Sequence, residues 1–385
     1  MKILLLAPQP FFQERGTPIA VDLLAKYLER ADHDVDLLTY NEGDVRHYER
    51  VNHHRIRSWF GISDVRPGLS GKKIVLDVFF FLRFLMMMTR RRYDVVHAVE
   101  ESVFMAAVIC PIFGVKYVYD MDSLMTTQVI DKLPVIKFLR PFLLFFESIP
   151  MRFASAVVPV CQALADVVKD YRIKGLFTLK DVSLIDSSAP PLPDVVNVRS
   201  KVANELPVLM YIGNLESYQG IDLMIDAFSE SLKETPANLV IIGGEDQHIS
   251  LYQKKVAELS IESAVFFLGK QPVSHLFDLM RQADLLMSPR IHGVNTPMKI
   301  YSYLDSGVAV VATDLPTHSQ VMDRDTACLT EPNSHAIAVA ITKLLNDPKE
   351  CQRLAVNAKN LIEREHSKEA FNRQLTKIYD YLAEL

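Results

Sequence analysis

The sequence predicts an α/β protein made of two doubly wound domains. Short runs of Val, Ile and Leu alternate with helical patterns along the whole chain. Continuous apolar strands joined by helices are typical of parallel sheets that are buried on both faces. A proline-rich stretch at 186–207 interrupts the alternation, which then restarts. The length of 385 residues suits two domains of ordinary size with some chain to spare.

Ten apolar runs predict the strands, five in each half. In the first half they are Ile3–Ala7, Val35–Tyr40, Asp94–His97, Val115–Tyr119 and Ala156–Val160, and the helix over Pro18–Arg30 follows the first of them. In the second half they are Val208–Gly213, Leu239–Gly243, Val265–Leu268, Ala283–Ser288 and Val308–Ala312. After Pro332 the pattern is helical, and it finishes in a helix over Lys368–Leu385.

These elements divide the chain into four parts. We expect a first domain over residues 1–187, a proline-rich linker over 188–206, a second domain over 207–366 and a terminal helix over 367–385. Doubly wound sheets bind ligands beyond the carboxyl ends of their strands. The functional residues should therefore lie in the loops that follow strands.

Composition excludes several classes of protein. Hydrophobic residues make up 49% and charged residues 23%, which is ordinary for a globular chain and excludes disorder, collagen and a disulfide scaffold. A net charge of −5 excludes a polycation for nucleic acid. The four cysteines are widely spaced, so we expect no zinc site, no disulfide framework and a cytoplasmic location. The six-residue apolar run before Pro8 reads as a buried strand and not as a signal peptide.

The net charge is divided unevenly between the halves. Residues 1–185 carry 24 basic and 21 acidic side chains, whereas residues 186–385 carry 18 and 26. Two segments of the basic half, 72–92 and 132–152, are rich in Phe, Leu and Met but are too charged to span a membrane. They predict either helices that lie on an anionic bilayer, at the inner face of the plasma membrane, or core helices with solvated ends.

The loop over 289–299 is the strongest candidate for chemistry. Thr296 suits an N-cap and is followed by a proline, so a helix should begin there with its amide groups open to an anion. Arg290 and Lys299 flank Gly293 in this loop. Two cations at a helix start favour a phosphate, whereas a capped helix with two solvated bases is the alternative.

Three other loops have the glycine and polar residues of a ligand site. A shorter version of the same pattern follows the first strand, with Arg15, Gly16 and Thr17. Glycines bracket polar residues after two strands of the second half, and the candidates there are Gly213, Asn214, Gln219, Gly244 and Glu245. Glycine lets a backbone approach a ligand closely.

Acidic residues follow two strands of the first half. Asp120 and Asp122 come after Val115–Tyr119 and could hold a metal diphosphate, a proton or a sugar hydroxyl. His97 ends its strand and precedes Glu100. A histidine in that position is either structural or catalytic.

Together these motifs resemble the glycosyltransferases of family 4, which have the GT-B fold of two Rossmann-like domains. The resemblance rests on the first-strand loop, the Asp94–His97 strand, the Tyr211–Gly213 loop leading into Gly220–Leu223, and the segment 289–314. It implies retaining transfer from a nucleotide-sugar donor without a metal or other cofactor. The donor would bind the C-terminal domain, the acceptor would bind the N-terminal domain, and the last helix would cross back to the N-terminal domain.

The chain departs from the family pattern at its charged positions. Where the family usually has the Arg and Lys that hold the donor diphosphate, this chain has Asn214 and Gln219. The two family glutamates would fall near Val294 and Ser302, and a family histidine corresponds to Asp120. Arg290 and Lys299 are the physical substitutes for the missing cations, because a buried phosphate must be paired.

From the resemblance and from the loops, we expect each candidate residue to act in catalysis, in donor binding or in acceptor binding. The catalytic candidates are Asp120, Asp122 and Lys299. The donor-binding candidates are Gly16, Gly213, Asn214, Gln219, Gly244, Glu245, Arg290, Gly293, Thr296, Lys299 and Ser302. The acceptor-side candidates are Arg15, Thr17, His97 and Glu100. A glycan and a lipid-linked molecule remain open as acceptors, and a sugar-nucleotide epimerase, a hydrolase and a non-catalytic binding partner of a membrane assembly remain as alternative functions.

Overall fold

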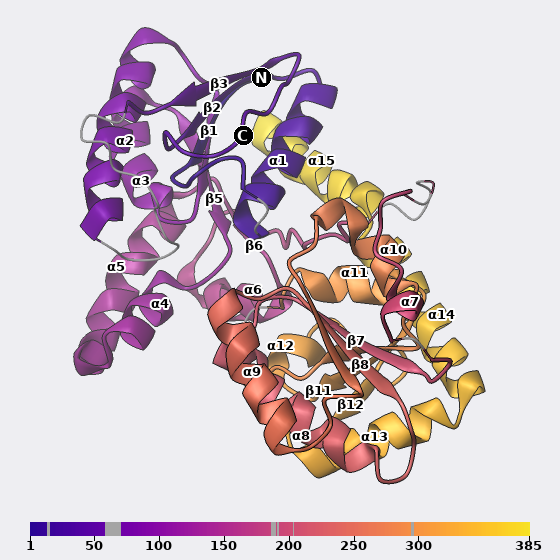
Figure 1. Cartoon of the computed structure of the whole chain (residues 1–385). Helices are drawn as coiled ribbons and strands as arrows, with labels where there is room; N and C mark the ends of the chain where they lie inside the picture. The colour runs from indigo at the N-terminus through magenta and orange to yellow at the C-terminus, as the bar shows by residue number, and fades with distance from the viewer. Residues whose placement is uncertain (14–15, 58–70, 186–189, 191, 203, 294–295) are drawn as a thin grey trace. The chain divides into compact units, whose positions relative to one another are not determined.

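The computed structural model describes residues 1–385 except 14–15, 58–70, 186–189, 191, 203 and 294–295. The chain forms two compact units (Figure 1). Met1–Lys180 and Phe371–Leu385 make the N-terminal unit, and Asp181–Ala370 make the C-terminal unit. The C-terminal segment thus returns to the first unit, as the family resemblance implies.

A six-stranded parallel sheet forms the centre of the N-terminal unit. Its order is β3-β2-β1-β4-β5-β6. The strands are β1 Lys2–Ala7, β2 Asp34–Thr39, β3 Val51–Arg55, β4 Val95–Val99, β5 Lys116–Met121 and β6 Ala156–Pro159. This is the doubly wound order, in which the direction of winding reverses between β1 and β4.

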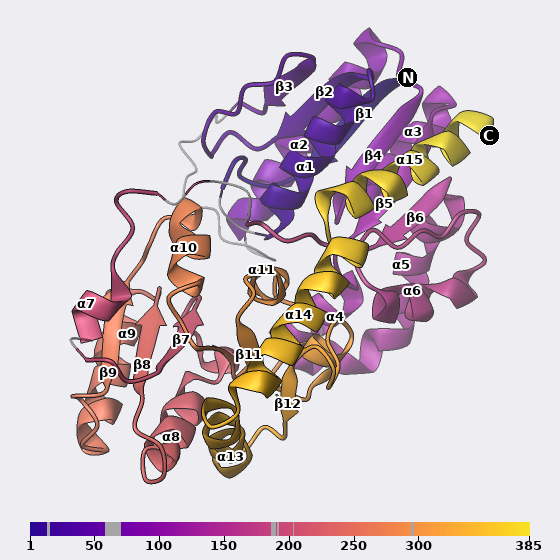
Figure 2. The same ribbon diagram turned by 90° about the vertical axis from the view of Figure 1, so that its right-hand side faces the viewer.

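Helices cover both faces of this sheet. They are α1 Gly16–Arg30, α2 Gly71–Arg90, α3 Ser102–Phe113, α4 Met125–Lys132, the 3₁₀ helix η1 Pro134–Leu139, α5 Arg140–Phe153, α6 Gln162–Val168, the 3₁₀ helix η2 Lys169–Tyr171 and α15 Lys368–Glu384. Helices α2, α3 and α5 lie on one face, and α1 and α15 lie on the other (Figures 1 and 2). Alternate strand residues such as Leu4 and Leu6 pack under α2 and α3.

The C-terminal unit repeats the same plan with its own strands. Its parallel sheet has the order β12-β11-β10-β7-β8-β9, which is again the doubly wound order. The strands are β7 Val208–Ile212, β8 Asn238–Ile242, β9 Val265–Gly269, β10 Leu285–Ser288, β11 Ala309–Thr313 and β12 Cys328–Thr330. The helices are α7 Val198–Val202, η3 Ser217–Gln219, α8 Ile221–Ser231, α9 Asp246–Glu258, η4 Val273–His275, α10 Leu276–Met280, α11 Lys299–Asp305, α12 Pro316–Ser319, α13 Ser334–Leu345 and α14 Pro348–Glu365.

The ten predicted strands are present, and the structure adds one edge strand to each sheet. Strand β3 (Val-Asn-His-His-Arg) is too polar, and β12 is too short, to show an apolar run. Part of the stretch predicted as a linker is folded, because α7 places Val198 and Val202 in the core of the C-terminal unit.

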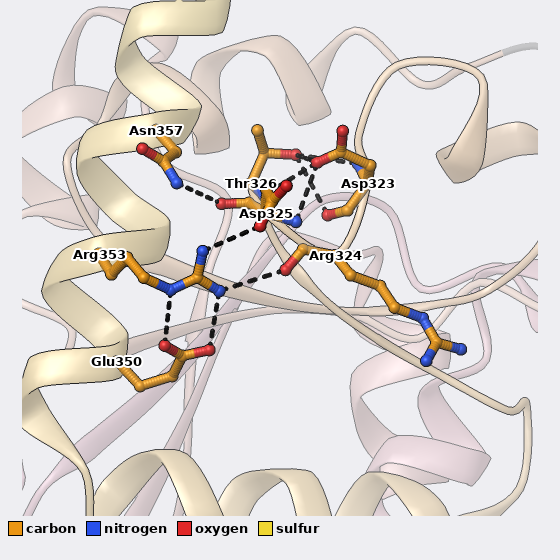
Figure 3. A network of polar contacts seen from close by, with 7 residues as sticks. All are labelled: Asp323, Arg324, Asp325, Thr326, Glu350, Arg353 and Asn357. Carbon is orange, nitrogen blue, oxygen red and sulfur yellow. Dashed lines mark hydrogen bonds and ion pairs between the residues drawn. The ribbon is translucent and has the colours of Figure 1, made fainter.

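A polar network fastens the loop before β12 to α14 (Figure 3). Arg353 donates to both carboxylate oxygens of Glu350, at 2.7 and 3.0 Å, and to Asp325 at 3.0 Å. Asn357 donates to the Asp325 carbonyl at 2.9 Å. The loop is further closed by Thr326, whose backbone N–H donates to Asp323.

Within the described residues, no helix is both long enough and apolar enough to cross a membrane.

Candidate functional site

The loops that follow β7 and β10 come together at the point where the winding of the C-terminal sheet reverses. These strands are hydrogen-bonded neighbours, with Leu209 paired to Leu285 and Met210 to Leu286. Their carboxyl ends therefore lie side by side, which is the position where doubly wound sheets bind ligands. The loop Ile291 N–H donates to the Tyr218 carbonyl at 3.0 Å and ties the two loops together.

The Lys299 ammonium lies at the centre of this region. It donates to the Gln219 side-chain oxygen at 3.4 Å and sits 3.9 Å from the centre of the Tyr211 ring. Burial lowers the pKa of Lys299 well below its usual range, and the nearby charge of Arg290 lowers it further. The structure thus places a cation next to Gln219, where the family resemblance leads us to expect a lysine.

Arg290 provides the second cation. Its Nε donates to the His292 carbonyl at 2.6 Å, and its guanidinium carbon lies 5.2 Å from the centre of the Tyr218 ring. Within the part of the chain that the structure describes, no carboxylate lies within ion-pair distance of Arg290 or Lys299. Two neighbouring cations with no acidic partner repel each other, so an anion bound between them would be favoured.

Glycines allow this close packing of loops. A Cβ on Gly213 would lie 2.9 Å from the Tyr211 hydroxyl and 3.2 Å from the Lys299 Nζ. A Cβ on Gly293 would lie 2.3 Å from the Arg290 guanidinium. Asn214 completes the loop after β7, since its carbonyl accepts from the Tyr211 hydroxyl at 2.6 Å and its side-chain amide donates to the Tyr218 hydroxyl at 3.3 Å.

The helix start that the sequence predicts at Thr296 is wrong. Helix α11 begins at Lys299 and its N-cap position is Met298, which makes no side-chain capping hydrogen bond. The Thr296 hydroxyl instead accepts from the Gln320 side-chain amide at 2.8 Å. A tertiary contact with the segment after α12 therefore takes the oxygen that local sequence would assign to capping.

The remaining donor-side candidates lie around this group and do not all face it. Ser302 is buried, and its hydroxyl accepts from the Leu184 N–H at 3.3 Å. Glu245 is exposed and accepts from Lys270 at 2.5 Å, which lowers the pKa of Glu245. Gly244 packs against Leu215 in the loop that follows β7. The structure therefore brings together Gly213, Asn214, Gln219, Arg290, Gly293 and Lys299, whereas Ser302 and Glu245 have other partners.

In the N-terminal unit, carboxylates gather at the ends of β4 and β5. The Thr17 hydroxyl donates to Asp122 at 2.8 Å, and the Glu100 N–H donates to the Asp120 carbonyl at 2.9 Å. Burial raises the pKa of both Asp122 and Glu100 well above their usual range, and mutual repulsion among the carboxylates raises both further. These groups can hold a proton near neutral pH, so they are suited to acid–base work.

His97 connects this acidic group to the last helix. Its ring is fully buried, its Nδ1 lies 2.8 Å from the Tyr379 hydroxyl, and its Nε2 lies 3.3 Å from Asp120. Both contacts are satisfied when Tyr379 donates to Nδ1 and Nε2–H donates to the Asp120 carboxylate. His97 therefore orients Asp120, and α15 supplies the hydroxyl that fixes its tautomer.

Two positions named in the sequence analysis lie outside the described residues, and the candidate carboxylates are not arranged as a metal site within the described residues. Arg15 lies outside the described residues, as does Val294, the position of the first family glutamate. Gly16 is the first residue of α1. Within the described ranges, no group of three His, Cys, Asp or Glu side chains is arranged to hold a metal ion.

One element of the site carries no motif in the sequence. His318 of α12 is fully buried, with its Nδ1 donating to the Thr313 carbonyl at 2.8 Å and its Nε2 2.9 Å from the Ser288 hydroxyl. The Thr313 hydroxyl in turn donates to the Arg290 carbonyl at 2.5 Å. This chain of contacts holds the backbone of Arg290, and only the tertiary structure reveals it.

Comparison with known families gives a match to each half of the chain. The profile of glycosyl transferases group 1 matches residues 197–361, and that of Glycosyltransferase Family 4 matches residues 15–177. An uncharacterized glycosyltransferase of Methanocaldococcus jannaschii is 22% identical over 230 residues, covering 57% of this chain and 58% of the relative. A D-inositol 3-phosphate glycosyltransferase of Nocardia farcinica is 27% identical over 161 residues, covering 40% of this chain and 36% of the relative. The chain thus spans between about a third and just over half of the curated relatives that it matches.

Solved structures match over nearly the whole length. Sucrose-phosphate synthase from Thermosynechococcus elongatus superposes with a TM-score of 0.78 at 18% identity, over 100% of this chain and 99% of the other. The Anabaena protein HepE in complex with UDP-glucose gives 0.73 at 17% identity, over 99% of each chain. WaaG, a glycosyltransferase involved in lipopolysaccharide biosynthesis, gives 0.69 at 14% identity, over 96% of this chain and 99% of the other. At these identities the structures establish the fold.

Proposed function

The chain belongs to the group 1 and family 4 glycosyltransferases and has their GT-B fold, and we propose that it transfers a sugar from a nucleotide-diphosphate donor to a glycan or lipid-linked acceptor. The observation that carries this proposal is the Lys299 ammonium, which lies against Gln219 with Arg290 as its charged neighbour. Transfer retains the anomeric configuration and needs no metal. We place the reaction in the cytoplasm, because the four cysteines are widely spaced in the sequence.

The donor diphosphate binds to Lys299 and Arg290. When the bond between sugar and phosphate breaks, negative charge grows on the leaving diphosphate, and positioned cations stabilise that charge without reorganising. A partly buried ammonium with a lowered pKa gains the most from such an anion, because the anion also stabilises its protonated form. Gly213 and Gly293 let the two cations lie close to the loop backbone, because a Cβ at either position would crowd the Lys299 or Arg290 side chain.

The carboxylates of the N-terminal unit act on the acceptor side. Asp120 orients the acceptor hydroxyl or the reacting sugar, and His97 holds Asp120 in place. Asp122 and Glu100 accept or hold the proton that the acceptor hydroxyl releases, which their raised pKa values suit. Thr17 keeps the Asp122 carboxylate oriented through its hydrogen bond.

Donor binding is tested by a thermal-shift screen in EDTA. The native protein is heated with UDP, GDP and ADP and with their sugars, uridine compounds first because HepE is known with UDP-glucose. We expect one base to raise the melting temperature, and Lys299→Ala to remove that rise. Lys254→Ala, an exposed lysine of α9, is the matched control and should keep it. If no nucleotide stabilises the native protein, or if Lys299→Ala keeps the full shift, the donor site is assigned wrongly.

A second candidate keeps the donor site and changes the reaction. Carboxyl groups that hold a proton near neutral pH also suit a sugar-nucleotide hydrolase or epimerase. Such an enzyme would consume the donor at full rate without any acceptor, whereas a transferase would need one. Loss of the second family glutamate at Ser302 also fits a non-catalytic binding protein, which would bind the donor and leave it intact.

A further inference from the structure

We infer that the helices α2, α3, η1 and α5 form a docking surface for an anionic lipid bilayer. Helices α2, α3 and α5 lie on one side of the N-terminal sheet (Figures 1 and 2), with α3 in contact with both α2 and α5. The 3₁₀ helix η1 contacts α5. The inner faces of α2, α3 and α5 pack on the strands, whereas η1 has no buried residue. The inference concerns this face alone and does not depend on the donor site.

Large apolar side chains cover the outer faces of all four helices. Val135 and Phe138 of η1 are 79% and 77% exposed, which is far more than a core helix would leave open. The other exposed members of this surface are Ile74, Val75, Val78, Leu82 and Met86 of α2, Val108, Ile112 and Phe113 of α3, and Leu139, Phe142, Phe145, Phe146 and Phe153 of η1 and α5. So many exposed large apolar side chains on neighbouring helices are typical of an interaction site.

Basic side chains accompany the apolar ones, and exposed acids do not. Lys137, Arg140 and Arg152 are exposed on η1 and α5, and Lys72 and Arg90 are exposed near the ends of α2. Among the described residues of the four helices there are two acids, and both have internal partners. Asp77 accepts from the Tyr40 hydroxyl, and Glu147 accepts from the N–H groups of Met125 and Thr126. The surface is therefore apolar and positively charged.

This combination selects a bilayer over a second copy of the chain. A symmetric dimer through the same face would bring Lys137 and Arg140 of one copy toward the like charges of the other, which is unfavourable. Anionic headgroups neutralise these bases while the neighbouring phenylalanines enter the interface. The aromatic stretch from Phe138 to Phe146 is the part that enters the bilayer most deeply, because it combines four exposed phenylalanines with ring contacts among Phe142, Phe145 and Phe146.

The test is flotation of the full-length protein with phosphatidylcholine vesicles, with and without phosphatidylglycerol. We expect binding to the anionic vesicles that weakens as salt is added. Phe138→Ser with Phe142→Ser should weaken binding roughly tenfold or more, because two large apolar side chains no longer enter the interface. Lys137→Gln with Arg140→Gln should weaken it about thirtyfold at low salt and flatten the salt dependence.

The matched control removes exposed apolar side chains from the other unit. Leu251→Ser with Val339→Ser changes residues of similar exposure on α9 and α13, and should bind anionic vesicles as the native protein does. Native protein that stays with the buffer, or apolar variants that float like native, would overturn the inference. A third result would also overturn it: native protein that sediments as a dimer and does not bind vesicles, together with a Phe138→Ser, Phe142→Ser variant that sediments as a monomer. Because no donor is present, any of these outcomes leaves the proposed transferase activity standing.

Discussion

At the residue scale, the site depends on contacts between side chains that are far apart in sequence. Arg290 and Lys299 stand out in the sequence as two cations in one loop, and that part of the site is predictable. Their partners are not, because Gln219 is 80 positions away from Lys299 and His318 is buried behind the loop without any motif. The predicted cap at Thr296 failed for the same reason, since a tertiary partner, Gln320, competes for its hydroxyl.

Gly220 provides a residue-scale test of the loop packing. It has a φ of 73°, and a Cβ there would lie 2.0 Å from the Pro289 carbonyl oxygen, next to Arg290. We expect Gly220→Ala to lower the free energy of unfolding and to weaken nucleotide binding together. Gly307→Ala is the control, because Gly307 has a φ of 79° but nothing within 4 Å of its Cβ position. We expect Gly307→Ala to lower the free energy of unfolding by about 1–2 kcal/mol, because of backbone strain, and to leave nucleotide binding unchanged. Equal effects of the two variants in denaturation and binding assays would contradict this packing.

His318 makes stability depend on pH. Burial is the main cause that lowers its pKa from the ordinary 6.5 to about 4, and the charges of Lys299 and Arg290 contribute to that shift. Since the unfolded chain binds the proton more readily, this stabilisation is complete above pH 6.5 and is lost as pH falls toward 4. We expect the free energy of unfolding of the native protein to fall by roughly 3 kcal/mol between these two pH values.

The measurement compares native protein with His318→Gln by urea denaturation at pH 7.5, 5.5 and 4.5. The difference in unfolding free energy between the two proteins should shrink as pH falls, because the native protein loses the stabilisation by neutral His318, which the variant lacks at every pH. His248→Gln, a partly exposed histidine of α9, should show the native pH dependence. A difference that stays constant with pH would show that His318 does not titrate as its burial implies.

At the scale of elements, apolar runs predict the central strands well because these strands are buried on both faces. Of the edge strands, β6 and β9 have apolar runs and are predicted, whereas β3 is polar and β12 has only 3 residues, so both escape prediction. The last helix is predictable as a helix from its pattern. Its place against β4 and α1, through Tyr379 and Tyr27, follows from the family resemblance and not from the pattern.

Helix α15 should contribute strongly to the stability of the N-terminal unit. Leu375 and Leu382 are fully buried, whereas Leu385 is 56% exposed. We expect Leu375→Ala to cost about 2–5 kcal/mol of unfolding free energy, because it leaves a cavity in a packed interface. The matched change Leu385→Ala should have almost no effect. Guanidinium denaturation followed by circular dichroism makes the comparison, and equal midpoints for the two variants would mean that α15 does not contribute to the stability of this unit.

At the scale of the whole molecule, the two halves have different surface chemistry. The net charge of −5 is the sum over two different parts: the N-terminal unit has a basic, apolar helical face, and the C-terminal unit brings Lys299 and Arg290 together at the reversal point of its sheet. The sequence shows this division as a difference in charge between its halves. Which apolar helices are exposed cannot be read from the pattern, because a core helix and a surface helix share the same composition.

The central claim is that Lys299 and Arg290 bind the donor diphosphate, and isothermal titration calorimetry tests it most directly. The nucleoside diphosphate that gives the largest thermal shift is titrated into native protein, Lys299→Met and Arg290→Met in two buffers of different ionisation enthalpy. We predict that each variant binds roughly tenfold or more weakly, since each loses a charged hydrogen bond. Burial and the charge of Arg290 lower the pKa of Lys299, and a bound anion raises it again, so native protein should take up more protons on binding than Lys299→Met does. Native affinity in both variants, with no proton uptake by the native protein, would contradict the account.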